Sequence, residues 1–207
     1  MNNDTNLSMA NTVAALSSEE DQVRTRARNS LVAVGKEAIP LLVEALKNPN
    51  SLVRWEATKA LSEIGDKSTA PALVKALEDD DFDIRWLATE GLTKMDVGGA
   101  IPLLHALMED PRSVSLREAA HHVLHNLAKG ELRECVAPVL AVLEGMSPPA
   151  EISLVALRAK EKLEEFESEK AGKKSDDSYL RRFATINEAM SPRARKQGRR
   201  YTRIFHV

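Results

Sequence analysis

The sequence lacks features that mark several large classes of protein. Its 207 residues include one cysteine, Cys135, which has no second cysteine in the chain, so an intramolecular disulfide scaffold is excluded. Aromatic residues make up only 4% of the chain, which disfavours β-sandwiches and barrels. No apolar run is long enough to span a bilayer, and the N-terminus has no basic segment followed by an apolar one. We therefore expect a cytoplasmic protein that does not enter a membrane.

Motifs for nucleophilic catalysis and phosphate binding are also missing from the sequence. The segment "ELRECVAP" places no histidine beside Cys135, and neither a Gly-rich phosphate loop nor a nucleophile elbow occurs. The carboxylates fall in predicted turns and on solvated helix faces, as on an ordinary protein surface. The sequence thus predicts a protein with no catalytic residues and no cofactor.

What the sequence does contain is a motif that returns at intervals of about 30 residues. Four segments align: "VRTRARNSLVAVG", "VRWEATKALSEIG", "IRWLATEGLTKMD" and "LREAAHHVLHNLA". Each has an arginine at its second position, and these residues, called the repeat arginines below, are Arg24, Arg54, Arg85 and Arg117. A constant period of this length indicates stacked structural repeats, in which each unit packs mainly against its neighbours.

Each repeat predicts a first helix with one apolar stripe, because its apolar residues recur at i, i+4, i+8 and i+11. The members of the stripe are Val23, Ala27, Leu31, Val34, Val53, Ala57, Leu61, Ile64, Ile84, Ala88, Leu92, Met95, Leu116, Ala120, Leu124 and Leu127. Gly35 and Gly65 stand where a helix favours a left-handed terminator. Acidic and small polar residues between the units are suited to cap the next first helix.

A second helix is predicted to follow in each unit, opened by a proline. Proline is tolerated in the first turn because the N–H groups there have no intrahelical partner to lose. The four prolines are Pro40, Pro71, Pro102 and Pro138.

The pattern extends beyond the four units that carry an arginine. Residues 9–16 align with a second helix that has no first helix before it. Near the other end, "VALRAKEKLEEF" keeps Ala159 and Leu163 of the apolar stripe but has Ala156 at the arginine position. Terminal units that depart from the pattern are typical of end caps, whose outer face meets water. We expect an all-α solenoid of about ten short helices over residues 8–167, followed by a C-terminal extension.

These repeats resemble HEAT repeats, specifically the short form of the phycobilisome-lyase HEAT-like family. The matching segments are "[VI]R…A…AL…[IV]G" at residues 23–35 and 53–65 and "A[IV]P.L…L" at 38–46 and 100–108. The resemblance implies an α-solenoid, but it leaves the function open, because the family includes scaffolds, chaperones, lyase subunits and enzymes. It also implies that the repeat arginines pair with acidic residues of an adjacent turn and form a structural ladder.

Two tryptophans interrupt the repeat at one position. Trp55 and Trp86 each follow a repeat arginine in consecutive units. Equivalent positions in adjacent repeats are neighbours in space, so we expect the two rings to form one aromatic strip. The strip either packs between helices or anchors a partner, since tryptophan is enriched at the centres of protein interfaces.

The histidines gather in the fourth unit, as His121, His122 and His125. His121 and His125 lie one helical turn apart and are the only candidates for a metal site. Deoxyhypusine hydroxylases, which also have HEAT-like repeats, hold a di-iron centre with His-Glu dipeptides, and this sequence contains no such dipeptide. We therefore favour a pH-sensitive or partner-facing patch that includes His122 over a metal site.

Charge divides the chain into an acidic body and a basic end. Residues 1–169 carry 18 Lys and Arg against 28 Asp and Glu, whereas residues 170–207 carry 11 against 3. Residues 168–178 are charged and small and predict a linker. Residues 179–207 predict a basic tail that starts with a short amphipathic helix and docks on a partner, or else lies on its own body or a sister chain. The tail residues expected to contact a partner are Phe183, Arg193, Arg195, Lys196, Arg199, Arg200, Tyr201 and Phe205.

The favoured function is a non-catalytic protein-interaction scaffold or assembly factor. One alternative is a nucleic-acid-binding protein whose tail arginines contact phosphates, since alkylpurine DNA glycosylases also have HEAT-like repeats. A further alternative, implied only by the resemblance, is a bilin lyase or chaperone-like subunit.

Removal of residues 170–207 tests the role of the tail. We expect the shortened protein to lose a stable partner in a pull-down, because the basic and apolar docking residues are gone. Helical content and melting temperature, measured by circular dichroism, are expected to stay largely unchanged. A collapse of the melting temperature would show instead that the tail belongs to the fold of the body.

Overall fold

The regular structure of the chain is helical. The computed structural model describes the backbone of residues 3–145 and 147–189 and the side chains of residues 8–145 and 147–172. Its α-helices are α1 Asn3–Ala14, α2 Asp21–Val34, α3 Ile39–Ala45, α4 Ser51–Ile64, α5 Ala70–Ala76, α6 Phe82–Lys94, α7 Val97–Glu109, α8 Val114–Leu127, α9 Arg133–Glu144 and α10 Pro149–Ala189. Short 3₁₀ helices are η1 Ala15–Ser17, η2 Gly35–Ala38 and η3 Lys67–Thr69. The described residues contain no strand, which confirms the all-α prediction.

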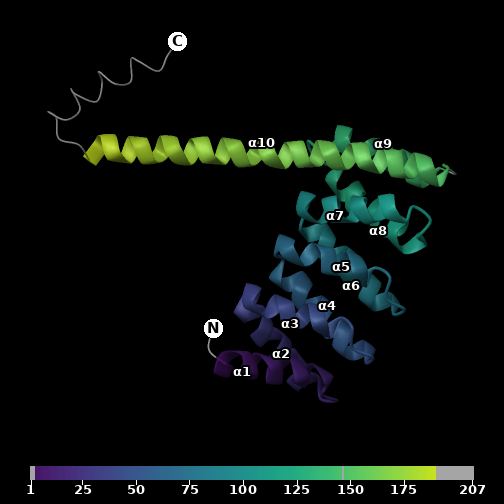
Figure 1. Ribbon diagram of the computed structural model, residues 1–207, viewed down its shortest axis with the longest axis vertical. Helices are drawn as coiled ribbons and strands as arrows, with labels where there is room; N and C mark the ends of the chain where they lie inside the picture. Colours follow the sequence, from purple (N-terminus) through teal and green to yellow (C-terminus); the bar gives the residue numbers. More distant parts are fainter. Residues whose placement is uncertain (1–2, 146, 190–207) are drawn as a thin grey trace, which may run out of the picture. The chain divides into compact units, whose positions relative to one another are not determined.

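The helices from α1 to α9 stack as successive antiparallel pairs (Figure 1). In one layer α2, α4, α6 and α8 lie side by side, each packed on the next. In the other layer α1 packs on α3 and α5 packs on α7. This arrangement is the predicted solenoid. The chain divides into two compact units, residues 1–164 and residues 165–207, and the stack belongs to the first. None of the helices in the described part of the chain could cross a membrane.

The predicted apolar stripe forms the core of the stack. Thirteen of its sixteen members are buried, and Ala57, Ala88 and Ala120 are fully inaccessible. The three exceptions lie in terminal turns of α2 and α4, where Val23 and Ile64 are half-buried and Val34 is exposed. The small alanine in the middle of each first helix therefore sits where neighbouring helices come together, as repeated stacking requires.

Second helices begin in two different ways. Pro40 and Pro71 lie in the first turns of α3 and α5, after a 3₁₀ turn, as the sequence predicts. The same prediction is wrong for Pro102 and Pro138, which lie inside α7 and α9. These two helices include residues that form the preceding turn in the earlier units.

The early start of α7 depends on Gly99. A Cβ atom at this position would lie 2.8 Å from the carbonyl carbon of Leu92, which is too close for any other residue type. The backbones of α6 and α7 can therefore meet directly, joined only by Met95 and Asp96, and Asp96 takes a positive φ of 50°.

Helix α10 covers the residues that the sequence predicts to form a linker and the start of the tail. Residues 168–178 lie within α10, which continues to Ala189. Five of the eleven residues of this segment are glutamate, lysine or alanine, which are good helix formers, and the other six are serine, aspartate and glycine, so its composition alone does not account for the helix. Deletion of residues 170–207 would therefore also remove helical residues, and the helical content should fall even if the melting temperature is kept.

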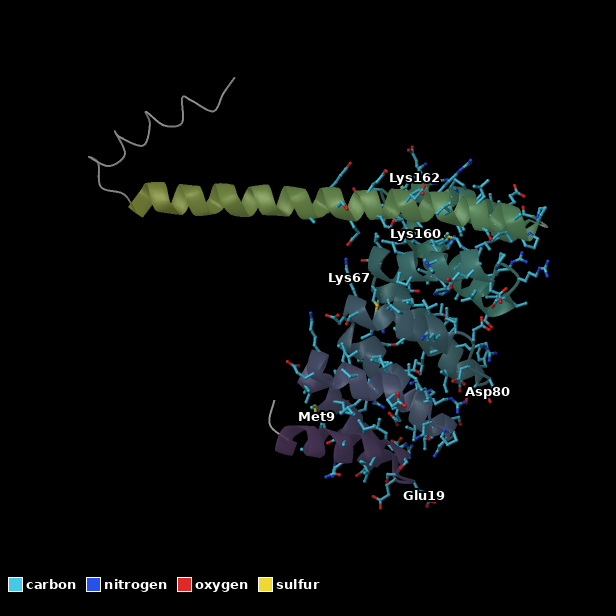
Figure 2. All side chains as sticks on the ribbon, viewed as in Figure 1. Met9, Glu19, Lys67, Asp80, Lys160 and Lys162 are labelled. Atoms are coloured by element: carbon cyan, nitrogen blue, oxygen red, sulfur yellow. The ribbon has the colours of Figure 1, made fainter. Side chains whose placement is uncertain are left out.

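Three repeat arginines hold the turns that precede their own helices. Arg24, Arg54 and Arg85 each donate from Nη1 to the carbonyl oxygens six and five residues earlier, at distances from 2.7 to 3.2 Å. The acceptors lie outside the helices and have no helical partner, so the guanidinium groups satisfy them. Figure 2 labels two of the acceptor residues, Glu19 and Asp80, on the same edge of the stack.

Arg54 also binds carboxylates of the next turn, as the resemblance implies. Its Nε and Nη2 atoms lie 2.7 and 2.9 Å from the two oxygens of Asp79, and Nη2 lies 2.6 Å from Asp80 Oδ1. Burial of the Asp79 carboxyl acts to raise its pKa, but the hydrogen bonds from Arg54 and the turn outweigh burial, so the net pKa is lowered. The pKa of Arg54 is raised, chiefly by the hydrogen bond to Asp79.

Arg24 instead binds a carboxylate on the neighbouring first helix. Its Nε lies 3.3 Å from Glu56 Oε1, and the other oxygen of Glu56 accepts a 2.6 Å bond from Arg28 Nη1. The Glu56 side chain is only 2% exposed, so two cations neutralise one buried anion. This cluster links α2 to α4.

Replacement of Asp79 tests the arginine–carboxylate contact. We expect Asp79→Asn to lower the free energy of unfolding at pH 7 by about 1–3 kcal/mol, because Arg54 loses a charged acceptor that is only 10% exposed. The folded pKa of Asp79 lies below its unfolded value of about 3.9. The contribution is thus complete above that value and is lost as the pH falls through the folded pKa, so wild type and variant should converge in acid. Urea unfolding across pH measures this.

Asp80→Asn is the matched control, because Asp80 binds the same guanidinium but its side chain is 90% exposed. Its effect should stay below about 1 kcal/mol. Equal losses in the two variants would contradict a special role for Asp79.

Replacement of Gly91 tests the close packing of α4 and α6. A Cβ atom there would fall on Ser62 Oγ and lie 2.9 Å from Leu73 Cδ1. We expect Gly91→Ala to destabilise the protein by about 1–3 kcal/mol, although alanine is the better helix former. Gly172→Ala has open space around it and should leave the melting temperature unchanged or raise it. A Gly91→Ala protein as stable as wild type would show that the helices can separate without cost.

Candidate functional site

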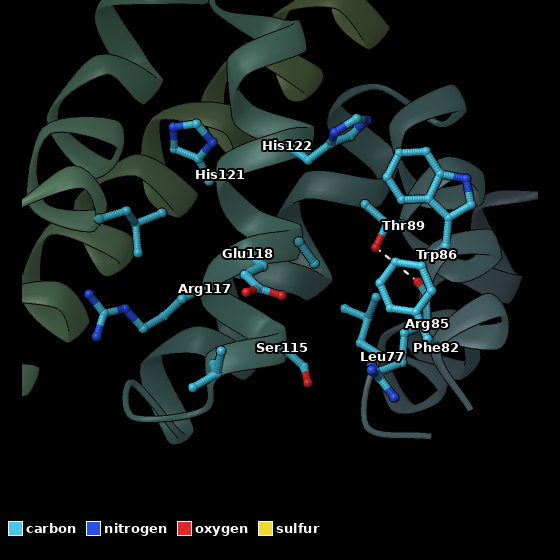
Figure 3. Close-up of a pocket in the computed structure, with 13 residues that line it drawn as sticks. Leu77, Phe82, Arg85, Trp86, Thr89, Ser115, Arg117, Glu118, His121 and His122 are labelled. Atoms are coloured by element: carbon cyan, nitrogen blue, oxygen red, sulfur yellow. Dashed lines mark hydrogen bonds between the residues drawn. The ribbon is translucent and has the colours of Figure 1, made fainter. Parts of the chain in front are cut away.

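A groove over α6 and α8 gathers exposed apolar side chains of the stack (Figure 3). Its volume is about 540 Å³. Five large apolar side chains are exposed among the described residues, and three of them line this groove. They are Phe82, Trp86 and Val114, with exposed fractions of 66%, 49% and 67%. The exposed apolar surface of the stack is therefore concentrated at one place.

Helix caps fix the walls of the groove. Asp81 caps α6 by accepting from the backbone N–H of Asp83 at 2.9 Å, and Phe82 is the first residue of that helix. Trp86 follows one turn later, so the two rings share a face of α6. On the opposite wall, Ser113 caps α8 and places Val114 at its start. Predicted caps thus set the orientation of the exposed apolar residues.

Trp86 belongs to this groove, whereas Trp55 does not line it. The Trp86 ring meets the His122 ring edge to face, with 5.5 Å between centroids, and His122 Nε2 lies 3.2 Å from Glu90 Oε1. Trp55 is half-buried, and the Arg28 guanidinium lies 6.0 Å from its ring. The described side chains show no contact between the two indole rings.

The tryptophans therefore face different repeats instead of forming the expected strip. Trp55 pairs with an arginine of the preceding unit, and Trp86 pairs with a histidine of the following one. The position aligned with Arg28 is occupied in the second unit by Thr58, whose short side chain bonds to its own helix at Arg54 O. No long cation is available there to pair with Trp86.

His121 and His125 are brought together, but the described side chains do not complete a metal site around them. Their rings stack with 6.1 Å between centroids, and His121 Nε2 lies 3.2 Å from Glu144 Oε1. No cluster of three His, Cys, Asp or Glu side chains suited to a metal ion occurs in the part of the chain that the structure describes. His121 lines the groove and His125 does not.

Arg117 departs from the other repeat arginines. Its side chain is half-buried, lines the groove and makes no hydrogen bond or ion pair with the described residues. In Figure 3 it extends from α8 on the side away from Trp86. The turn before α8 is held differently, since Ser113 Oγ donates to Glu78 Oε1 at 2.5 Å. The structural role implied for Arg24, Arg54 and Arg85 therefore does not extend to Arg117.

The expected tail residues fall outside the described side chains. Phe183 lies within α10, and its side chain is not described. Arg193, Arg195, Lys196, Arg199, Arg200, Tyr201 and Phe205 lie outside the described residues altogether. Their proposed contacts with a partner stay predictions.

Sequence reasoning missed Phe82 and Val114. Each is a single large apolar residue within a polar turn segment, "EDDDFD" and "PRSVS", and that isolation was the available signal.

Comparison with known proteins supports the architecture. Residues 9–93 match the family described as HEAT repeats. No curated protein sequence matches the chain. Among solved structures, the complex of CpcE and CpcF of phycocyanin lyase from Nostoc sp. PCC7120 is similar, with 20% identity over 74% of this chain and 98% of that chain and a TM-score of 0.51. A designed armadillo repeat protein in complex with a (KR)4 peptide has 20% identity over 73% of this chain and 80% of that one, with a TM-score of 0.38.

At such low identity the likeness to these structures concerns the fold alone. The helix pairs α1 to α9, the repeat arginines and the match in sequence agree with one another. Residues 9–93 of this chain match HEAT repeats in sequence, and the helix pairs after them continue the same stack.

Proposed function

We propose that the protein is a non-catalytic protein-interaction scaffold and that the groove over α6 and α8 is its docking surface. The observation that carries the proposal is the gathering of Phe82, Trp86 and Val114 around one groove. Single apolar residues on a surface are ordinary, whereas a contiguous group with a polar rim is typical of interaction sites. HEAT-repeat stacks are a common framework for such surfaces.

A protein segment suits this groove better than a nucleic acid does. Aromatic side chains beside polar groups form the centres of protein interfaces. Residues 1–169 carry ten more acidic than basic residues, and this excess around the groove repels an extended phosphate backbone, although the residues that line the groove itself include two arginines and one glutamate. If nucleic acid binds at all, the basic residues 170–207 are the part suited to it.

The basic tail is the second docking element of the proposal. Residues 179–207 combine arginines with aromatic and aliphatic residues, a composition suited to a segment that binds a protein partner. The complex of CpcE and CpcF is a protein complex that includes a similar fold, which fits a role in assembly.

Site-specific photo-crosslinking in the native cells tests the groove. A photoreactive phenylalanine analogue placed at Val114, which is 67% exposed, is expected to capture a discrete partner. The same analogue at Leu154, which is 47% exposed and does not line the groove, is the control for random capture.

The aromatic side chains supply the matched variants. Phe82→Ala with Trp86→Ala should reduce the adduct at Val114 by about tenfold or more, because truncated aromatic anchors commonly lose at least 2 kcal/mol. Trp55→Ala should leave the adduct in place, since Trp55 does not line the groove. An adduct that survives loss of both groove aromatics, or no adduct at Val114, would contradict the proposal.

A further inference from the structure

The groove contains an arginine whose partners are missing from its own stack. Arg24, Arg54 and Arg85 bind carbonyl oxygens of the preceding turn, while Arg117 makes no such bond within the described residues. A half-buried guanidinium carries five N–H donors in a planar fork and is suited to a carboxylate. Two separate features of the sequence leave the Arg117 guanidinium without a partner among the described residues.

The first cause is the turn before α8. The carbonyls at the positions used by the other repeat arginines belong to Pro111 and Arg112. This turn is anchored without Arg117, because Ser113 Oγ donates to Glu78 and also caps the N–H of Leu116 at 3.1 Å. Serine takes over the function that arginine has in the earlier repeats.

The second cause is the absence of a suitable carboxylate in the next turn. Arg54 uses Asp79 and Asp80, but the turn at residues 145–148 has the sequence Gly-Met-Ser-Pro, without an acidic residue. Glu144, just before this turn, lies 3.2 Å from His121. Among the residues that the structure describes, neither the preceding turn nor the following one therefore supplies a partner for the Arg117 side chain.

The groove is lined by this cation and by the exposed aromatic residues, which Figure 3 shows on opposite sides of it. Phe82 and Trp86 line it from α6, Arg117 lines it from α8, and Leu143 lines it from α9 (Figure 3). Glu118 is the only carboxylate among the lining residues, and Arg85 is a second cation there. The local charge of the lining is thus positive, in contrast to the acidic body, and it favours an acidic group in the occupant.

Resting on the proposed scaffold function, we propose that the occupant is a segment of a partner protein that carries a carboxylate for Arg117 and an apolar side chain for Phe82 and Trp86. The carboxylate of the partner binds Arg117 in the way that carboxylates of the next turn bind Arg54 within the stack. The apolar side chain covers rings that are exposed in the free protein. Glu118 is exposed and lies between Arg117 and the two aromatic side chains, so it disfavours a segment that is acidic throughout.

A random library of 12-residue peptides displayed on phage, selected on the full-length protein, tests the proposal. Enriched peptides should contain an aspartate or glutamate at a constant spacing from an aromatic or aliphatic residue. One enriched peptide is then synthesised, and its Kd is measured by fluorescence anisotropy. Failure to enrich any peptide, or enrichment of basic peptides, would overturn the carboxylate assignment.

Variants at Arg117 give the quantitative test. Arg117→Gln should weaken the peptide about tenfold or more, because a charge-assisted hydrogen bond is lost. Arg117→Lys should bind with intermediate affinity, because it keeps the charge but not the fork. Arg112→Gln, the matched control, removes an exposed arginine that does not line the groove and should change the Kd less than about twofold.

Charge exchange guards against a variant that merely disturbs the fold. Arg117→Glu should abolish binding of the acidic peptide and restore binding of the same peptide with its acidic residue changed to lysine. Equal Kd values for wild type and Arg117→Gln would overturn this inference. If peptide binding requires Trp86 but not Arg117, the carboxylate inference fails and the scaffold proposal stands. If peptide binding requires neither residue, both the inference and the scaffold proposal fail.

Discussion

The hydrogen bonds from one guanidinium group to two carbonyl oxygens of the turn before its helix recur in three repeats, and the order of the stack depends on them. Turns between helix pairs leave carbonyl groups without helical partners. Arg24, Arg54 and Arg85 supply those partners from the same position of each first helix. Each turn is therefore held in the same place relative to the helix that follows, and the buried alanines of successive first helices can pack alike.

The local spacing of residues was enough to predict this frame. Arginine at a fixed position and apolar residues at helical intervals indicate the helix pairs without any knowledge of distant contacts. The start of α7 could not be read in the same way, because it depends on how closely Gly99 approaches Leu92 of another helix. The helical structure of residues 168–178, which were predicted to form a linker, could not be read from the sequence for a different reason. The apolar stripe ends there, yet α10 continues through a segment of mixed helix propensity.

The candidate site was predictable only where the repeat is visibly interrupted. Trp86 attracts attention because only one other unit has a tryptophan at that position, and His122 because the aligned positions hold other residue types; the structure places both beside the groove. Arg117 gave the opposite signal, since it occupies the regular position of a structural arginine. Its different state arises from what the neighbouring turns lack, and alignment of arginines alone does not reveal a missing acceptor. A residue that keeps its type in every repeat but loses its partners is therefore as informative as a residue whose type changes.

The buried cluster of Glu56 with Arg24 and Arg28 limits how the array can grow by tandem duplication. Glu56 is neutralised by two cations of the unit before it. A second copy of residues 51–81 inserted after the first would place its buried glutamate next to Arg54 and Thr58, with one cation where the present arrangement has two. The duplicated unit would carry an anion only partly compensated in the interior, so lengthening at this point requires a further substitution. The units look alike in sequence, yet their electrostatic dependence on a specific predecessor gives the array a fixed order.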